Sequence, residues 1–164
     1  MPKTRIAIVA LTLFLAVGAS AQAEIKRGDA GPNTFSGTPH RDWYWGYGGN
    51  DTLFGRAATD YLYGGGDNDT IVAGRGADFA YGGDGADEIA LRRGNDFAWG
   101  GAGADRISTG FGADTVKGGP GNDTIYATAD DGAVDSIDCG TGTDHALIRA
   151  GDTTLNCETV DTVT

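Results

Sequence analysis

Aspartate recurs at every ninth residue over most of this chain, with glycine around it. From Gly28 to Tyr126 the sequence divides into eleven consecutive blocks of nine residues, such as GGDGADEIA (82–90) and GGAGADRIS (100–108). The sixth residue of a block is acidic in every block but the first, where it is Asn33. These acidic residues are Asp42, Asp51, Asp60, Asp69, Asp78, Asp87, Asp96, Asp105, Asp114 and Asp123. A regularly spaced carboxylate supplies the hard anionic oxygen that Ca²⁺ prefers as a ligand.

The residues before each aspartate are rich in glycine, which takes up backbone conformations that other residues resist. Such segments form tight turns, and an open glycine turn leaves carbonyl oxygens free to face a cation. Carbonyl and carboxylate oxygens together make up the donor set of a calcium site. The spacing therefore predicts a series of metal-binding turns.

The last three residues of each block must form the element that positions the turn. The eighth residue is mostly apolar, as at Leu53, Ile71 and Ile89. In a short strand its side chain points inward while its two neighbours point outward. One block then crosses one face of a coil, two blocks complete a coil, and blocks two apart stack about 4.8 Å from each other.

The pattern G-G-x-G-x-D-x-U-x, with U apolar, resembles the RTX, or hemolysin-type, calcium-binding repeat. The resemblance covers about residues 28–147, because two looser copies follow a three-residue slip after Tyr126. It implies an all-β fold, a right-handed parallel β-roll with two repeats per coil. It also implies several Ca²⁺ ions between successive turns, held by the aspartate at position six and by carbonyl oxygens of the turn.

Alternate blocks fall on opposite edges of such a roll, and one edge carries turns that fit the repeat closely, such as GGDGAD and GGPGND. The resemblance places carboxylate ligands there at Asp51, Asp69, Asp87, Asp105 and Asp123. It places further ligands at the third turn residues, Gly48, Gly66, Asp84, Ala102 and Pro120. Six stacked turns leave five gaps, so we expect about five ions on this edge.

The other edge has lost glycines and gained arginines, namely Arg41, Arg56, Arg75, Arg92 and Arg93. A guanidinium near a turn can neutralise an aspartate without metal. We therefore expect fewer ions on this edge, at Asp78, Asp96 and Asp114, where the turn keeps a glycine at its fourth position. The alternative is ordinary decay of the repeat, with the arginines solvated.

The strands that follow this second edge carry aromatic residues at both outward positions. They are Trp43, Trp45, Tyr61, Tyr63, Phe79, Tyr81, Phe97 and Trp99. An apolar patch on a single face usually marks a contact. Three interpretations stay open. The rings could stack on a glycan or other flat polymer, or pack against a second copy or a cell-surface protein. They could also be covered by the chain's own C-terminal segment or simply stabilise strand pairing.

The N-terminus has the pattern of an export signal. Lys3 and Arg5 precede an apolar run from 6 to 17, and Ala21-Gln22-Ala23 offers a cleavage site. This predicts a secretory signal peptide over residues 1–23, since the run is shorter than the roughly 20 residues that span a bilayer. We expect no membrane span in the mature chain, which would be secreted to the extracellular space.

The mature chain would then comprise a calcium-binding β-roll over 24–147 and a C-terminal cap over 148–164. Cys139 and Cys157 are the only cysteines. Export favours a disulfide between them, which would tie the cap over the last coil.

Acidic residues outnumber basic ones by 23 to 12, for a net charge of −11. This balance argues against nucleic acid as a partner, because its recognition needs clustered Lys and Arg. The chain has only two histidines, His40 and His145, and shows neither H-E-x-x-H nor G-x-S-x-G. We therefore predict a non-enzymatic, secreted protein whose folding is driven by Ca²⁺, as a structural or adhesive module. The alternative is a carbohydrate- or polymer-binding module that uses the aromatic face.

Overall fold

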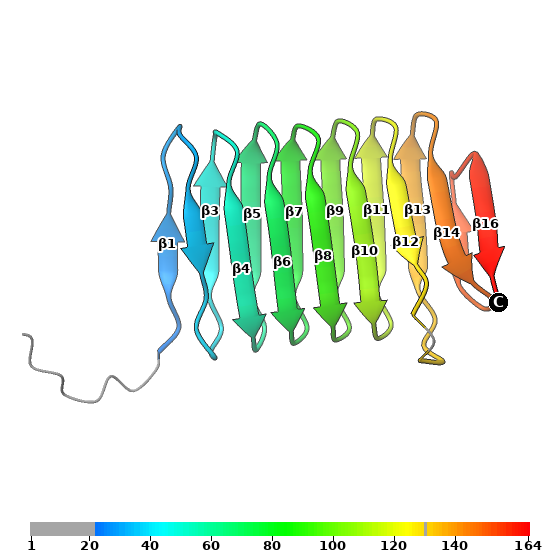
Figure 1. Ribbon diagram of the computed structural model, residues 1–164, viewed down its shortest axis with the longest axis horizontal. Coiled ribbons are helices and arrows are strands. Elements are labelled where there is room, and N and C mark those ends of the chain that lie inside the picture. The colour runs from blue at the N-terminus through cyan, green and yellow to red at the C-terminus, as the bar shows by residue number, and fades with distance from the viewer. Residues whose placement is uncertain (1–21, 130) are drawn as a thin grey trace, which may run out of the picture.

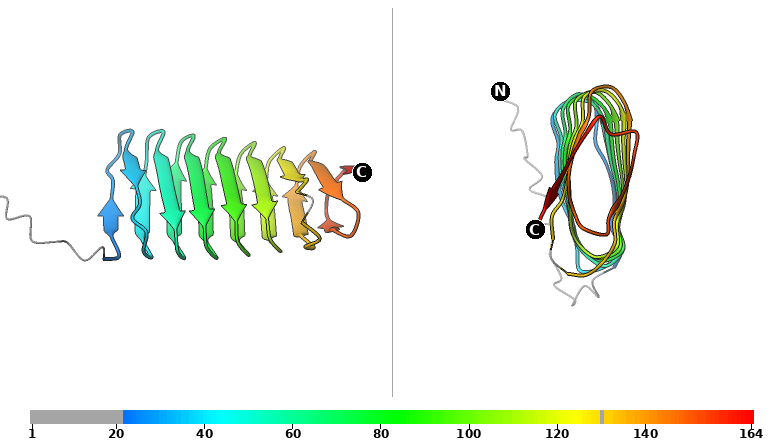
Figure 2. Two further views of the ribbon diagram at one scale, coloured as in Figure 1. Left: turned by 60° about the horizontal axis from the view of Figure 1, so that its bottom comes forward. Right: turned by 90° about the vertical axis from the view of Figure 1, so that its right-hand side faces the viewer.

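The computed structural model describes residues 22–129 and 131–164, so the predicted signal peptide lies almost wholly outside the described residues. Within them the chain forms strands only, wound into a flattened coil (Figures 1 and 2). In Figure 1 the front strands run downward and the back strands upward as the chain advances to the right, which makes the coil right-handed. This confirms the predicted all-β parallel roll. No helix long and apolar enough to cross a bilayer occurs in the described part.

Two parallel sheets face each other, and each pairs alternate strands of the chain. Sheet A contains β1 (Ile25–Arg27), β3 (Trp43–Tyr47), β5 (Tyr61–Gly66), β7 (Phe79–Asp84), β9 (Phe97–Ala102), β11 (Thr115–Pro120), β13 (Ser136–Thr141) and β15 (Thr153–Leu155). Sheet B contains β2 (Thr34–Ser36), β4 (Thr52–Ala57), β6 (Thr70–Arg75), β8 (Glu88–Arg93), β10 (Arg106–Phe111), β12 (Thr124–Ala127), β14 (His145–Arg149) and β16 (Thr159–Val163). Two nonapeptides therefore complete one coil, as the spacing predicts.

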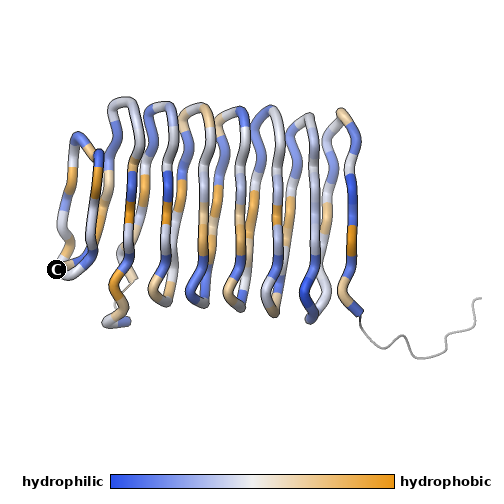
Figure 3. The backbone as a smooth tube through the Cα atoms, turned by 180° about the vertical axis from the view of Figure 1, so that it is seen from behind, coloured by the Kyte–Doolittle hydropathy of each residue, from blue (hydrophilic) through white to orange (hydrophobic). Residues whose placement is uncertain are grey.

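The core consists of side chains at two inward positions of each strand, the eighth residue of one block and the first residue of the next. Leu62, Ala80 and Ala98 line it from sheet A, and Ile71 and Ile89 from sheet B, all fully or almost fully buried. Figure 3 shows these apolar positions as bands that recur from coil to coil. Because each strand contributes few side chains, some of them only alanine, the core is thin.

Most strands are longer than the three residues that the pattern predicts. In β7, for example, pairing continues into the first turn residues, where Gly83 lies opposite Gly65 and Asp84 opposite Gly66. The glycine turn is therefore partly strand. Its backbone bonds to the neighbouring coil, which orders the turn before any ion is considered.

The three-residue slip is absorbed in one turn. The amide of Asp114 reaches a carboxylate 21 residues ahead, at Asp135, instead of the usual 18. The strands on either side keep their register, with Val116 opposite Ile137. The longer turn between β12 and β13 projects from the lower edge in Figure 1.

The C-terminal segment adds a last coil. β15 pairs with β13, and β16 pairs with β14, so both sheets continue to the end of the chain. The predicted disulfide is confirmed: Cys139, buried in β13, is bonded to Cys157 in the turn between β15 and β16.

We expect the disulfide to stabilise this last coil. It closes a loop with a sequence separation of 18 residues, which the chain-entropy model values at about 3 kcal/mol. Replacing both cysteines, as Cys139→Ser with Cys157→Ser, should lower the free energy of unfolding by that order in saturating Ca²⁺. Hydrogen exchange should locate the loss in β15 and β16. Unchanged unfolding and exchange in the double variant would contradict this role.

Candidate metal centres

The regular spacing of the aspartates places them in two columns along the edges of the roll. Edge 1, the upper edge in Figure 1, consists of the turns that lead from sheet A to sheet B. It carries Asp51, Asp69, Asp87, Asp105 and Asp123, followed by Asp144. Edge 2, at the bottom, consists of the turns that lead back and carries Asp42, Asp60, Asp78, Asp96, Asp114 and Asp135. All of these side chains are buried.

One oxygen of each carboxylate ties successive coils together. The amide of Asp69 donates to Oδ1 of Asp87 at 2.8 Å, and the amide of Asp87 donates to Oδ1 of Asp105 at 2.9 Å. The same bond recurs along both edges at 2.6 to 2.9 Å. Each aspartate therefore accepts a charge-assisted bond from the backbone of the preceding coil.

The other oxygen, Oδ2, is buried and accepts no hydrogen bond from the described residues. This holds for Asp51, Asp60, Asp69, Asp78, Asp87, Asp96, Asp105, Asp114, Asp123 and Asp144. An unpaired buried charge is costly, and proteins normally pair it or coordinate it to a metal. On each edge, the row of unpaired Oδ2 atoms is therefore the chemical feature that a bound cation would stabilise.

On edge 1 a glycine at the first turn position leaves space beside Oδ2. A Cβ added to Gly82 would collide with Oδ2 of Asp87 and with the carbonyl oxygen of Gly100 in the next coil. The same pairing of oxygens recurs beside Gly46, Gly64, Gly100 and Gly118. A carboxylate oxygen and a carbonyl oxygen thus converge once per coil, which fits the oxygen ligands of Ca²⁺. Sequence reasoning did not single out these first-position glycines, although every close-fitting turn has one.

Carboxylates alone do not complete a metal site. Within the described residues no three side chains of His, Cys, Asp or Glu come together. Ca²⁺ takes six to eight oxygen ligands, so backbone carbonyls and water must supply most of them. This agrees with a turn that offers carbonyl oxygens from glycine.

The predicted third-position carbonyls have other partners. The carbonyl of Ala102 accepts a bond from the amide of Gly85 at 2.7 Å, and that of Pro120 accepts one from Gly103 at 2.8 Å. A carbonyl oxygen has a second lone pair, so these bonds leave a ligand role open. These hydrogen bonds do not place Gly48, Gly66, Asp84, Ala102 or Pro120 next to Oδ2, so the role of their carbonyl oxygens as calcium ligands stays a prediction.

Edge 2 differs from edge 1 at the first turn position. Ala73, Leu91 and Thr109 replace glycine there, and all three are fully buried. Thr109 donates from Oγ1 to Oδ2 of Asp135 at 3.0 Å, which satisfies that carboxylate within the protein. Only Gly55 keeps the arrangement of edge 1, beside Oδ2 of Asp60 and the carbonyl of Ala73. Asp60 is a candidate that the sequence analysis did not choose.

Arginine does not neutralise the aspartates of edge 2. Among the described residues the ion pairs are Lys26–Glu24 and His145–Asp161, and none joins an arginine to an edge 2 aspartate. Instead Arg41 lies over the ring of Trp43, and Arg93 lies over Phe111. The proposed metal-free compensation by guanidinium groups is therefore not found.

Burial raises the pKa of aspartates on both edges. It raises the pKa of Asp69, Asp87, Asp105 and Asp123 on edge 1 to about 6. On edge 2 the pKa of Asp96 rises to about 7 and that of Asp114 to about 8. Desolvation is the largest cause throughout, and the backbone bond to Oδ1 opposes it in part.

These features define a parallel β-roll with anionic oxygens along its edges. A family model described as the RTX calcium-binding nonapeptide repeat matches in four copies, at residues 27–53, 36–71, 63–98 and 99–134. The chain therefore belongs to the RTX calcium-binding repeat family. The nonapeptide turns of this family bind Ca²⁺, and several ions are expected across the repeats. Neither a curated protein nor a solved structure matches the chain.

The eight predicted aromatic residues do lie together, on the outer face of sheet A. They form two ladders along the roll, in which Tyr61 stacks on Trp43 at 5.4 Å and Tyr63 stacks on Trp45 at 5.7 Å between ring centroids. The planes of these rings differ by only 3°. Phe79, Tyr81 and Phe97 continue the ladders at 4.8 to 6.3 Å. Most ring faces are therefore covered by the next ring.

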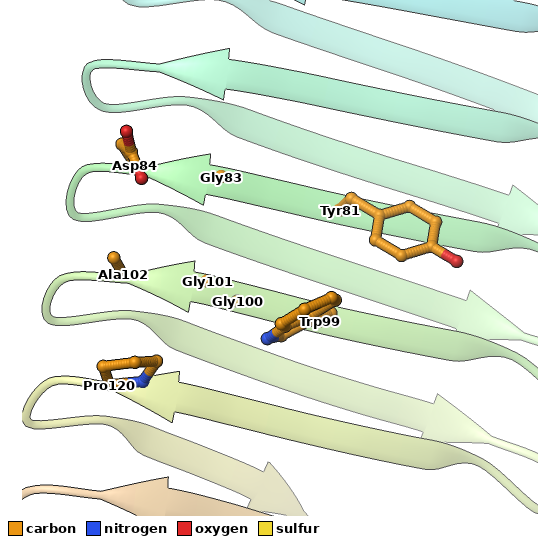
Figure 4. Close-up of a pocket in the computed structure, with 8 residues that line it drawn as sticks. All are labelled: Tyr81, Gly83, Asp84, Trp99, Gly100, Gly101, Ala102 and Pro120. Carbon is orange, nitrogen blue, oxygen red and sulfur yellow. The ribbon is translucent and has the colours of Figure 1, made fainter.

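Trp99 ends its ladder differently. Its ring meets Tyr81 edge to face, and the next residue in register is Lys117, which is not aromatic. Trp99 is 46% exposed and borders a hollow of about 380 Å³, shown in Figure 4, with Tyr81 on one side and Pro120 on the other. It is the ring with the most open surface among the eight.

Replacing a single edge 1 carboxylate should have opposite effects with and without calcium. In Asp87→Asn an amide nitrogen takes the place of one oxygen and can donate to the carbonyl of Gly100. We expect the variant to be more stable than the parent in metal-free buffer, because a buried charge is gone, and less stable in saturating Ca²⁺. Thermal unfolding measures this in saturating Ca²⁺, and the fraction of β structure seen by far-UV circular dichroism measures it in metal-free buffer.

Asp84→Asn is the matched control. It removes the same charge from the same turn, but Asp84 is exposed and its backbone carbonyl is unchanged. We expect both stabilities to stay close to those of the parent. Equal shifts in the two variants, or a loss of stability in both buffers for Asp87→Asn, would argue against an ion at Asp87.

The raised pKa values also predict how the calcium-free protein responds to pH. The folded pKa values, about 6 to 8, exceed the unfolded value of 3.8, so the folded state binds more protons than the unfolded chain between about pH 4 and pH 8. Stability in metal-free buffer should therefore rise as pH falls from 8 towards 5. In Ca²⁺ the dependence should weaken or reverse, because protons compete with the ion. In metal-free buffer, a fraction of β structure that decreases as the pH is lowered from 8 to 5 would contradict the burial of ionised carboxylates.

Proposed function

We propose that the chain is an extracellular calcium-dependent β-roll whose folding is driven by the ions that it binds. The main support for this proposal is the column of buried Oδ2 atoms on edge 1, each beside a carbonyl oxygen of the next coil. We assign the ions to Asp51, Asp69, Asp87, Asp105 and Asp123. Ligands that come together only in the folded state make binding energy part of the folding energy.

On edge 2 we propose fewer ions. The first-position side chains of Ala73 and Leu91 fill the place that glycine leaves open on edge 1. Asp60, beside Gly55, is the best-suited carboxylate by this criterion, ahead of Asp78, Asp96 and Asp114. The Oδ2 atoms of all four lack a partner among the described residues, so the difference lies in the neighbouring space.

Secretion is part of this proposal. Its support is the basic, apolar and small-residue pattern of residues 1–23 together with the disulfide Cys139–Cys157, a bond that persists in oxidising compartments. Outside the cell Ca²⁺ is plentiful, whereas the chain would meet little of it before export. The ions would then allow folding to follow export, which suits a structural or adhesive module.

We assign no catalysis to the chain. The buried carboxylates already have a role as calcium ligands, and His145 lies at the surface in contact with Asp161. A module that binds a carbohydrate polymer on the aromatic face has weaker support. Stacking on a sugar needs a free ring face, and in the ladders most faces are covered by neighbouring rings. Trp99 alone would suit such a contact, and the ladders are better explained as support for strand pairing.

A calcium titration of residues 24–164 tests the proposal. Starting in metal-free buffer near pH 7.5, far-UV circular dichroism should show a cooperative change from coil to β structure. We expect a midpoint in the range of about 10⁻⁴ to 10⁻³ M, typical of extracellular calcium modules. Mg²⁺ should not reproduce the change, because it demands a smaller octahedral site. A β spectrum already complete without metal, and unchanged by Ca²⁺, would overturn calcium-driven folding.

A further inference from the structure

A cluster of arginines lies on sheet B, away from the calcium column of edge 1. Arg56, Arg75, Arg92 and Arg93 come from the ends of β4, β6 and β8, at the arrowheads in the lower part of Figure 1. They line a hollow of about 600 Å³ that also contacts Phe111 of β10. We call this site the arginine hollow. The net charge of −11 for the whole chain gives no sign of this local cluster of positive charge.

The strand register sets the spacing of these side chains. Arg56 and Arg92 lie in one row along the roll, with Gly74 between them. Arg75 and Arg93 lie opposite each other in the next row. Because strands are about 4.8 Å apart, four guanidinium groups are presented over three neighbouring coils, a span of roughly 10 Å between the outer strands.

The four positive charges have no acidic partner within the described residues. Both ion pairs found there lie elsewhere, at Lys26 and at His145. All four arginines are exposed. Arg93 is held over the ring of Phe111, with 5.6 Å between Cζ and the ring centroid. A guanidinium stacked in this way keeps its in-plane N–H donors free for an anion.

The backbone gives a second reason to look for a function here. Arg56 and Arg92 have φ angles of 82° and 85°, whereas the residues in register with them, Gly74 and Gly110, are glycines with φ of 120° and 96°. The roll therefore requires positive φ at this position, which glycine meets without strain. Arginine does not help the fold in this place, and its charge has no structural partner.

The rim of the hollow is apolar as well as basic. Phe54 is 37% exposed and Phe111 is 50% exposed, at opposite ends of the site, and Val72 lies between them. A ligand that fits must therefore carry anionic groups about one coil spacing apart and an apolar surface. Sugar rings that bear sulfate, phosphate or carboxylate groups combine both features.

We propose that the arginine hollow binds an anionic oligosaccharide of a few sugar units. A long nucleic acid fits less well, because it would extend beyond the three coils onto the acidic remainder of the surface and be repelled there. The site is separate from the calcium column of edge 1. Its arginines belong to turns of edge 2, to which we assign fewer ions, and Ca²⁺ keeps the roll folded.

The test compares two double variants in saturating Ca²⁺ and physiological salt. Arg56→Gly with Arg92→Gly removes two charges from the hollow and places glycine where positive φ favours it. Its fold should be kept or stabilised, which a melting curve verifies. Arg27→Gln with Arg106→Gln removes the same charge elsewhere. Calorimetry measures the binding of three probes: a short dextran sulfate, uncharged dextran of the same length, and an oligodeoxythymidine.

We expect the parent to bind dextran sulfate, to ignore uncharged dextran and to bind the oligonucleotide more weakly. The hollow variant should lose about tenfold or more in affinity, the scale of lost charge-assisted bonds, while the control stays within about twofold. No binding by the parent, or equal losses in both variants, would overturn the proposal. Preference for the oligonucleotide would replace the glycan by nucleic acid. If the glycine variant fails to fold, Arg75→Gln with Arg93→Gln applies the same criteria.

Discussion

Each coil of the roll buries a carboxylate oxygen that the protein itself does not neutralise, and the rest of the structure depends on this cost. Oδ1 of Asp87 is bonded to the coil before it, whereas Oδ2 has no partner among the described residues. The opposing hydrophobic gain is small, because the inward row includes residues as short as Ala80 and Ala98. Because the core is thin and the edge carries a column of like charges, we propose that folding and metal binding form one equilibrium.

Glycine serves this arrangement in two distinct ways. At Gly82 the missing side chain leaves space for the two oxygens beside it. At Gly83 the backbone has a φ of 123°, and a Cβ would collide with the carbonyl of Gly65 in the preceding coil. We assign the first glycine to the proposed ion site, whereas the second is needed for the stacking of coils. A residue other than glycine therefore has different consequences at the two positions, which the repeat pattern alone does not separate.

Much of the fold could be predicted because the period of nine fixes which residues share a row. The inward position of Ile71 and the gathering of Trp43 and Tyr61 on one sheet follow from counting. The pairing of the two cysteines follows from their number and from the predicted export. Counting does not say which way an atom points. It could not show that ring faces cover each other, or that the carbonyl of Ala102 is already bonded.

The same limit explains what sequence reasoning missed on edge 2. Arg56, Arg75 and Arg92 stand three or four residues before the turn aspartates in the sequence, which suggested ion pairs between them. In the structure the carboxylates are buried inside the edge, whereas these arginines are exposed on the outside. Net charge also averages over the whole surface, whereas a binding site depends on the charges that one small region brings together.

The two edges show how one repeat can relieve the same electrostatic cost in different ways. Edge 1 keeps glycine beside Oδ2 and thereby keeps room for an ion. On edge 2, Leu91 adds buried apolar surface in that place, which strengthens the core but leaves Asp96 with its Oδ2 unpaired. Burial raises the pKa of Asp96 to about 7 and that of Asp114 to about 8, so near neutral pH a proton can take the place of the metal. We therefore propose that edge 2 depends less on calcium, which leaves outward positions such as Arg92 available for a role at the surface.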